Sequence, residues 1–310
     1  MVAVSSMREM LSRARDSDIY WSFKRSKLVV VAFCVTMVIF LGAVLAPLLA
    51  PHNPLDLASL NLSDAFLPPA WESAGMAKFP LGTDDQGRDL LSAIMFGLRT
   101  SLLVGFLAVV FAMVLGIALG LIAGYVGGAV DSIIMRVADV QLSFPAILVA
   151  MLIDGVTRSL LGNEMRDTSA MVVLIVAIGL SYWVQYARTV RGSVLVEKNK
   201  EYVQAARVIG LSSTLIAIRH VLPNVLGPVL VIATINLALA IITEATLSFL
   251  GVGLPATQPS LGTLINTGQK FLFSGEWWIT IFPGITLAVL VLAVNLLGDW
   301  LRDALNPKLR

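Results

Sequence analysis

Polar and ionisable residues inside long apolar runs are the positions of this sequence most able to do chemistry. Between residues 132 and 153, Ser132, Arg136, Asp139 and Ser143 are spaced so that they share one face of a helix. A charge that faces lipid costs several kcal/mol, so these groups should turn toward a partner or an aqueous cavity. In the simpler interpretation Arg136 and Asp139 pair with each other at i, i+3. In the alternative, the stripe lines a translocation path.

A second apolar region carries Asn236 near its middle and Glu244 just beyond its end. No basic residue lies near Glu244 in the sequence, so it could pair with a basic residue of an outer loop or line the exit of a cavity. We expect a structural or gating role for Glu244, not direct contact with a substrate. Together with Arg136 and Asp139, these two residues are the predicted set for a translocation path or for polar pairing inside the membrane.

Motifs for covalent chemistry are missing from the sequence. A phosphate-binding P-loop needs Gly-Lys followed by Ser or Thr, and no lysine here follows a glycine. There is no HExxH zinc motif, and neither His52 nor His220 has a metal-ligand partner nearby. Cys34 is the single cysteine and falls in an apolar run. We therefore predict no catalytic residue, no metal site and no cofactor bound by this chain.

The composition indicates a membrane protein. Of 310 residues, 57% are hydrophobic and 14% charged, and the mean hydropathy is +0.85. A membrane-spanning helix needs about 20 apolar residues. Six runs meet this requirement: 28–50, 102–125, 132–153, 169–187, 225–243 and 278–297. The third is the weakest, because Arg136, Asp139 and Pro145 interrupt it. The predicted fold is all-α and polytopic, with six transmembrane helices.

The basic residues predict the orientation of these spans. Most of the 22 Lys and Arg cluster before the first span, between residues 188 and 219, and after the last span. Positive charge accumulates on the cytoplasmic side, so both termini and the 188–219 region should lie there. The net charge of +2 gives no indication of nucleic-acid binding. The length of the first apolar run, and the 27 residues before it, argue against a cleavable signal peptide.

The spans divide the chain into five predicted parts. Residues 1–27 form a cytoplasmic or interfacial N-terminal segment, and 28–50 form the first transmembrane helix. Residues 51–101 form an extracytoplasmic loop with a short interfacial helix. Residues 102–297 form a core of five transmembrane helices, which includes a short outer loop at 154–168 and a cytoplasmic loop at 191–224. Residues 298–310 form a cytoplasmic tail.

The second span carries small residues at every fourth position: Ala108, Ala112, Gly116, Gly120, Gly124 and, just beyond, Gly128. Such a stripe lets another helix backbone approach closely. The pattern does not decide between packing within the bundle and packing in a dimer.

The charged segment after the fourth span predicts two short helices around a glycine corner. Asn199 is a good N-cap, and Glu201 falls in the first turn, where the helix dipole favours an anion. Gly210 suits a left-handed helix end. Ser212 can cap a second helix, which should stop near residue 222 because Pro223 follows.

This segment resembles a known docking element. Gln204-Ala205-Ala206, Gly210 and Leu222-Pro223 are similar to the EAA loop of ATP-binding-cassette (ABC) importer permeases, which docks into a groove of the ATPase subunit. The resemblance implies a coupling role for Glu201, Gln204, Ala205, Ala206, Gly210, Leu222 and Pro223. Gln204 stands where Glu is usual and His220 where Ile is usual, and Glu201 could supply the missing acid.

Other strings extend the resemblance to one branch of that family. EYVQAARVIG and TEATLSFLGVG are similar to permeases of the dipeptide/oligopeptide branch, of the C type. In the segment LGTDDQGRDLLSAIMFGLRTSL, Thr83 and Gln86 have capping-box spacing before a short amphipathic helix. In that branch the segment faces the binding protein, which implies contacts from Asp84, Asp85 and Arg88. An interfacial elbow helix is the alternative interpretation.

The resemblance implies a type I ABC importer permease fold and a set of partners. These are a second homologous permease, two cytoplasmic ATPase subunits that use ATP and Mg, an extracytoplasmic binding protein and the lipid of a bacterial inner membrane. The implied cargo is a short peptide or a related small solute. The alternative is an ion-coupled secondary transporter, which needs an inverted repeat that we do not find and a midplane acid, for which Asp139 is the candidate.

Overall fold

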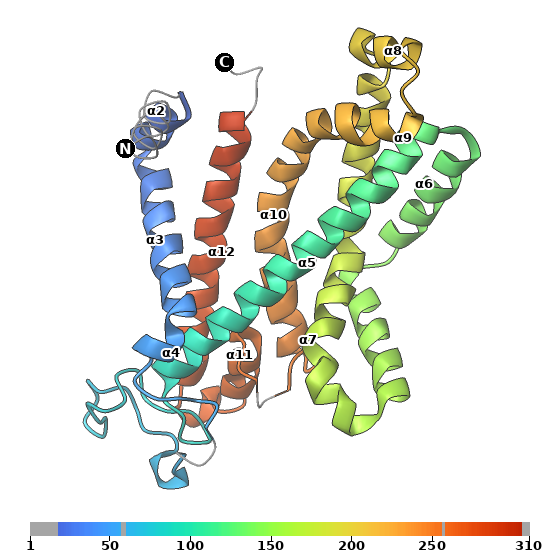
Figure 1. Cartoon of the computed structure of the whole chain (residues 1–310). Coiled ribbons are helices and arrows are strands. Elements are labelled where there is room, and N and C mark those ends of the chain that lie inside the picture. The colour runs from blue at the N-terminus through green and yellow to red at the C-terminus, as the bar shows by residue number, and fades with distance from the viewer. Residues whose placement is uncertain (1–17, 57–59, 256–257, 306–310) are drawn as a thin grey trace, which may run out of the picture.

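The computed structural model describes residues 18–56, 60–255 and 258–305, and it is a bundle of helices (Figure 1). Most of the predicted N-terminal segment and the end of the predicted tail lie outside the described residues. Five helices are long and apolar enough to cross a membrane, and a sharply bent pair makes up to a sixth crossing. The described residues contain no strand. The all-α, polytopic prediction is confirmed.

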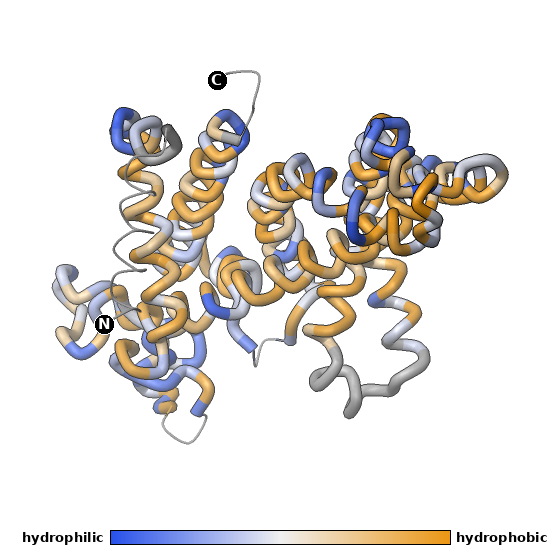
Figure 2. The backbone as a smooth tube through the Cα atoms, turned by 45° about the horizontal axis from the view of Figure 1, so that its top comes forward, coloured by the Kyte–Doolittle hydropathy of each residue, from blue (hydrophilic) through white to orange (hydrophobic). Residues whose placement is uncertain are grey.

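The described chain contains eleven labelled α-helices, and the loops connect them. They are α2 (Asp18–Arg25), α3 (Lys27–Val44), α4 (Ala46–Leu49), α5 (Leu90–Val126), α6 (Gly128–Leu142), α7 (Ala146–Glu197), α8 (Glu201–Val208), α9 (Ser213–Ile216), α10 (Leu222–Phe249), α11 (Leu261–Gln269) and α12 (Trp278–Leu305). Their apolar residues form an orange band between the bluer ends of the molecule (Figure 2).

The two ends of the described chain lie on the same side of the bundle. Ser26 caps α3, since its hydroxyl accepts the N–H of Val29 at 3.5 Å. Phe23 of α2 packs edge-on against Phe33 and against Trp300 of α12, with ring centroids 5.5 and 5.3 Å apart. Helix α8 lies on this side too, at the top of Figure 1.

The small-residue stripe of α5 faces α7. A Cβ atom added at Gly116 would lie 2.4 Å from the Cβ of Tyr186, and one at Gly120 would lie 2.5 Å from the carbonyl oxygen of Ala187. A Cβ atom added at Gly124 would lie 2.9 Å from the side chain of Val194. The stripe therefore packs the two longest helices of the described chain together. Of the two alternatives left open by the sequence, the structure shows packing within the bundle.

The third span is broken in its middle. Helices α6 and α7 meet at an angle of 93° around Ser143–Pro145, with Pro145 at the start of α7. Proline disfavours helical conformation in the residue before it and has no N–H to donate, so the helix cannot run through this point. The span predicted at 132–153 is thus two helical segments.

Helix α7 also corrects the predicted outer loop at 154–168, because the chain is helical from Ala146 to Glu197. No proline interrupts this stretch. Its 52 residues would extend for about 78 Å if straight, far more than a bilayer needs. It instead has an arm at Ala146–Thr157 and a spanning arm at Ala170–Glu197. The arms meet where the Ser181 hydroxyl approaches the Ala146 carbonyl oxygen at 3.5 Å.

The short helix expected to stop near Leu222 instead continues into the fifth span. A π-helical turn at Ala217–Val221 links α9 to α10 without a break. Pro223 lies in the first turn of α10. Because it closely follows the π-helical turn, its missing N–H falls where the regular α-helical hydrogen-bond pattern is already interrupted. The prediction of an independent second helix was therefore wrong.

The short interfacial helix predicted before the second span is not separate either. Helix α5 runs without interruption for 37 residues from Leu90, and Asp89 is its N-cap. Helix α11 is a shorter helix near the end of the bundle opposite α8, with a capping box formed by Ser260 and Thr263. It packs between α10, α5 and α12.

Candidate functional site

The glycine-cornered segment projects as α8 from the end of the bundle that also carries α2 and the end of α12 (Figure 1). Lys200, not Asn199, occupies the N-cap of this helix, and the Asn199 amide donates back to the Leu195 carbonyl oxygen at 3.1 Å. Glu201 lies in the first turn, as predicted. Gly210 has φ of +86°, the left-handed conformation expected there.

The tip of this segment exposes apolar side chains. Val208 is 89% exposed and Ile209 77% exposed, whereas Val203 and Ala206 of the same helix are buried. Ser212 caps α9 by accepting the N–H of Leu215 at 3.4 Å, as predicted. The sequence reasoning missed Val208 and Ile209, because an apolar pair next to a glycine gives no periodic signal.

Three polar side chains, which we call the brace, tie the base of α8 to its neighbours: Glu197, Tyr202 and Asn224. The Tyr202 hydroxyl donates to the Glu197 carboxylate at 2.5 Å and accepts from the Asn224 amide at 3.1 Å. Lys200 pairs with the other oxygen of Glu197 at 2.8 Å. Desolvation, together with the Glu197 carboxylate, raises the pKa of the Tyr202 phenol. The brace joins the end of α7, the start of α8 and the start of α10.

Two ion pairs fasten α6 to α7 below the brace. Arg191 binds both carboxylate oxygens of Asp131, at 2.5 and 2.7 Å, and Arg188 binds Asp139 at 2.5 Å. The predicted local pair of Arg136 with Asp139 was therefore wrong. Arg136 is exposed. The i, i+3 spacing of the two arginines, opposite two aspartates on the preceding helix, is the signal that could have revealed this pairing.

Asn236 is buried on α10, and neither of its amide atoms has a hydrogen-bond partner among the described residues. The hydroxyl of Tyr186 on α7 is also buried and unpartnered in that part of the chain. The two side chains lie near one another. They form a buried polar contact between α7 and α10, next to the part of α7 that packs on Gly116 of α5.

Glu244 lies in a buried polar cluster, which we call the outer joint, formed by Ser101, Glu244, Ser248 and Ser260. Its carboxyl is fully buried and accepts from the Ser248 hydroxyl at 2.8 Å. The hydroxyls of Ser101 and Ser260 lie beside the same carboxyl. Each of these two oxygens already accepts a backbone N–H at 3.2 Å, from Leu261 and Thr263, so its own hydrogen is free to point at Glu244. A basic partner was one of the two alternatives predicted for Glu244, but no basic side chain of the described residues pairs with it; serines from α5, α10 and the start of α11 surround its carboxyl instead.

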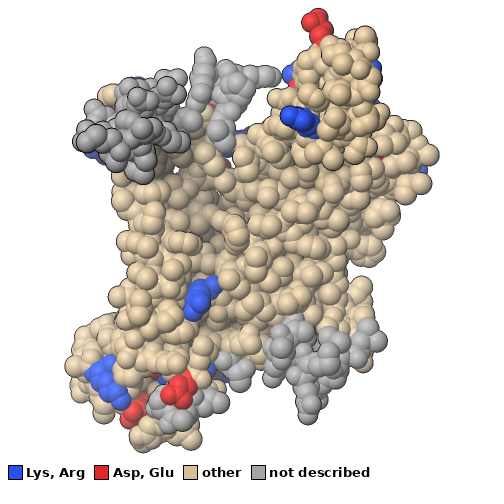
Figure 3. Space-filling model, in the orientation of Figure 1, with Lys and Arg blue, Asp and Glu red and all other residues tan. Residues whose placement is uncertain are grey.

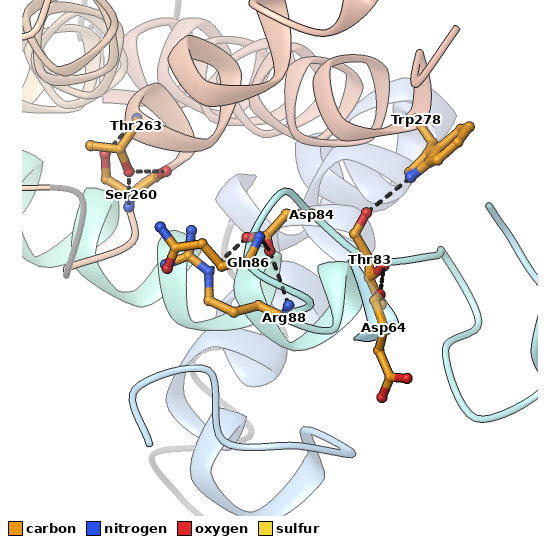
Figure 4. Close-up of polar contacts among 8 residues, drawn as sticks. All are labelled: Asp64, Thr83, Asp84, Gln86, Arg88, Ser260, Thr263 and Trp278. Carbon is orange, nitrogen blue, oxygen red and sulfur yellow. Dashed lines mark hydrogen bonds and ion pairs between the residues drawn. The ribbon is translucent and has the colours of Figure 1, made fainter. Parts of the chain in front are cut away.

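The outer loop turns most of its predicted contact residues inward (Figure 4). The Asp84 carboxylate accepts the backbone N–H of Gln86 and of Arg88, each at 2.9 Å, and pairs with the Arg88 guanidinium at 2.6 Å. Both side chains are buried, so they stabilise the loop and are not presented to a partner. Asp85 is half-buried. Desolvation of its carboxyl raises its pKa, and the negative charge of the neighbouring Asp84 raises it further.

Thr83 does not cap a helix, contrary to the predicted capping box. Its hydroxyl donates to the Asp64 carbonyl oxygen at 2.6 Å and accepts the N–H of Leu67 at 2.8 Å. Its carbonyl oxygen accepts the indole N–H of Trp278 at 3.1 Å, which ties the loop to α12 (Figure 4). The loop is a folded unit held against the bundle.

These features define an integral membrane protein with a protruding helix at one end of the bundle and a buried polar joint near the other. Residues 116–310 match the family model described as binding-protein-dependent transport system inner membrane component. Residues 17–69 match the N-terminal TM domain of oligopeptide transport permease C. The chain belongs to the family of binding-protein-dependent transport system inner membrane components.

Individual relatives agree with this assignment. The chain is 43% identical over 293 residues to the dipeptide transport system permease protein DppC of Escherichia coli strain K12, covering 94% of this chain and 93% of that protein. It is 36% identical over 308 residues to the dipeptide transport system permease protein DppC of Bacillus subtilis strain 168, covering 99% and 90%. These matches confirm the resemblance inferred from the sequence, and they give no support to the ion-coupled alternative.

The fold has a solved counterpart. An inward-facing structure of the MetNI methionine ABC transporter superposes with a TM-score of 0.53 at 19% identity, covering 69% of this chain and 96% of the matched chain. At this identity the likeness concerns the fold alone. It confirms the expected permease architecture.

Proposed function

We propose that this chain is one of two homologous membrane-spanning subunits of an ATP-driven importer for dipeptides or closely related small solutes. The observation that carries the proposal is α8, which extends beyond the bundle with an exposed apolar tip and is joined to α7 and α10 at its base. The names of the similar permeases support the peptide cargo. Two cytoplasmic ATPase subunits, which use ATP and Mg, and an extracytoplasmic binding protein complete the assembly.

In this mechanism the chain does no covalent chemistry and binds no cofactor. The ATPase holds α8 by Val208 and Ile209, and its closure on ATP displaces the helix. The brace passes this displacement to α7 and to α10, because it links both helices to α8. Helix α10 carries it to the outer joint, where Glu244 connects to α5 and α11. A cytoplasmic location of α2 and of the end of α12 follows from this orientation, since both lie on the side of α8.

Uptake by proteoliposomes tests the proposal. We expect a labelled dipeptide to accumulate when the chain is reconstituted with its second permease, the ATPases, the binding protein and ATP. Omission of ATP or of the ATPases should abolish uptake. Accumulation driven by an ion gradient without nucleotide would contradict the proposal.

The tip variant Ile209→Asp sharpens this test. A carboxylate on the apolar tip should reduce copurification of the ATPase subunits at least tenfold, because an unpaired charge is costly to bury in an interface. Ile209 is highly exposed, so the fold should be unaffected. Phe273→Asp is the matched control, since Phe273 is 98% exposed but lies on the outer side. If the ATPase subunits copurified equally well with both variants, the tip of α8 would not be the docking site.

A further inference from the structure

Arg99 is a charged side chain on an otherwise apolar face of the bundle. It is exposed on α5, nine residues after the helix begins at Leu90, and no ion pair or hydrogen bond to its guanidinium occurs within the described chain. The face shown in Figure 3 has hardly any charged side chains between its two ends. An unpaired guanidinium in such a belt needs an anion from outside the chain.

A groove of about 410 Å³ lies next to this residue, between α3 and α5. Apart from Arg99 its walls are apolar, from Phe40, Ala43 and Val44 of α3 and from Leu102, Leu103 and Phe106 of α5. Phe40, Val44 and Phe106 are between 51% and 58% exposed, so their surfaces are open to an external occupant.

The position of the groove along the helices matches the headgroup region of one leaflet. Helix α3 ends at Val44, and α5 begins at Leu90, both at the end of the bundle that carries the outer loop. Arg99 lies about 14 Å along α5 from that end, at 1.5 Å per residue. A long arginine side chain can extend back toward the interface, while Phe106 lies about 10 Å deeper. The groove thus offers one cation near the interface and apolar walls that run inward.

We propose that this groove binds one phospholipid, with its phosphate on Arg99 and an acyl chain against Phe40, Leu103 and Phe106. The planar guanidinium fits two phosphate oxygens at once. A carboxylate of the second permease subunit is the other candidate partner, but a single cation at the end of an apolar groove is complementary to an amphiphile. The proposal relies on the proposed orientation only to assign the outer leaflet.

Photo-crosslinking in nanodiscs tests the site. The full complex is placed in phosphatidylcholine that contains a small fraction of phosphatidylglycerol with a diazirine on one acyl chain, and labelled peptides are mapped by mass spectrometry. We expect labelling to concentrate at residues 40–44 and 102–106. Arg99→Gln should lower it about tenfold, the effect of losing a hydrogen bond to a charged group. Arg99→Lys should retain most of it.

Two further variants make the result decisive. Leu103→Trp fills the groove without changing its charge, and it should also lower the labelling. Lys270→Gln removes an exposed outer cation away from the groove, and it should leave the labelling unchanged. Even labelling of all lipid-facing peptides, or release of the second permease instead of lipid by Arg99→Gln, would overturn the proposal. Neither outcome bears on peptide uptake, so the site and the proposed function can fail separately.

Discussion

Tyr202 illustrates how a single side chain can connect three helices. Its hydroxyl uses its hydrogen toward Glu197 and its lone pair toward Asn224, so it joins α7 to α10 through α8. The pKa of the phenol is raised above its ordinary value of 10.0. The group therefore stays protonated, and remains a donor, at neutral pH. Sequence reasoning named the neighbouring Glu201 and Gln204 instead, because a tyrosine in a family motif carries no obvious charge.

Replacement of Tyr202 by Phe tests the brace. The variant loses both hydrogen bonds, each worth about 1 kcal/mol or somewhat more. We expect peptide uptake to fall severalfold while ATPase copurification and hydrolysis persist, so that transport per ATP decreases. Tyr125→Phe is the control, since the Tyr125 hydroxyl has no partner in the described structure. If uptake and hydrolysis fall together in Y202F, the brace does not transmit motion.

The elements show which kinds of prediction from sequence were reliable. The apolar runs predicted the spanning helices well, because about 20 consecutive apolar residues have few alternatives to a membrane helix. Predictions that relied on local stop signals fared worse. Pro223 was expected to end a helix but lies in the first turn of α10, and residues 154–168 were expected to form a loop but are helical.

In the candidate site, features decided by the local sequence were predicted correctly, and contacts between separate helices were not. Gly210 and Ser212 adopt the predicted backbone roles, because a left-handed turn and an N-cap are decided locally. The partners of Asp139 and Glu244 were not predictable, since Arg188 and Ser101 reach them only through packing of separate helices. Pairings between helices depend on rotation and crossing angle, which periodicity does not specify.

The α5–α7 interface gives a prediction at the scale of elements. Gly120→Ala adds a Cβ atom 2.5 Å from the Ala187 carbonyl oxygen and 2.9 Å from the Val190 side chain. Although alanine favours a helix by about 1 kcal/mol, overpacking should cost about 1–3 kcal/mol. We expect a melting temperature several degrees lower in detergent. Gly192→Ala, where the added atom meets nothing within 4 Å, should be neutral or stabilising. A similar loss in both variants would show that close packing at Gly120 is not responsible.

At the scale of the whole molecule, the structure separates two working ends. Helix α2, the end of α12 and α8 lie at one end, and the folded loop, α11 and the outer joint lie at the other (Figure 1). Long helices connect the two ends, and α10 reaches from the coupling segment to Glu244. An importer requires such continuity, because energy enters on one side and cargo on the other.

Accessibility labelling checks this arrangement. In a Cys34→Ser background expressed without the ATPase subunits, which would cover Val208, single cysteines are placed at Val208 and Phe273, which are 89% and 98% exposed. We expect a membrane-impermeant maleimide to label Phe273→Cys on intact spheroplasts and Val208→Cys only after lysis, because the two residues lie at opposite ends of the bundle. Labelling of both on intact spheroplasts would refute the orientation.

The π-helical turn at Ala217–Val221 has a consequence for the evolution of the chain length. Such a turn holds one surplus residue relative to an α-helix, and one residue corresponds to about 100° of rotation around the axis. Deleting a single amino acid from this turn would let it become α-helical while Asn236 and Glu244 keep facing the same helices, whereas the same deletion from the regular part of α10 before Asn236 would rotate both away by about 100°. A change of length by one residue should therefore be tolerated at this turn, as it is in surface connections, and should be excluded from the regular helix that follows it.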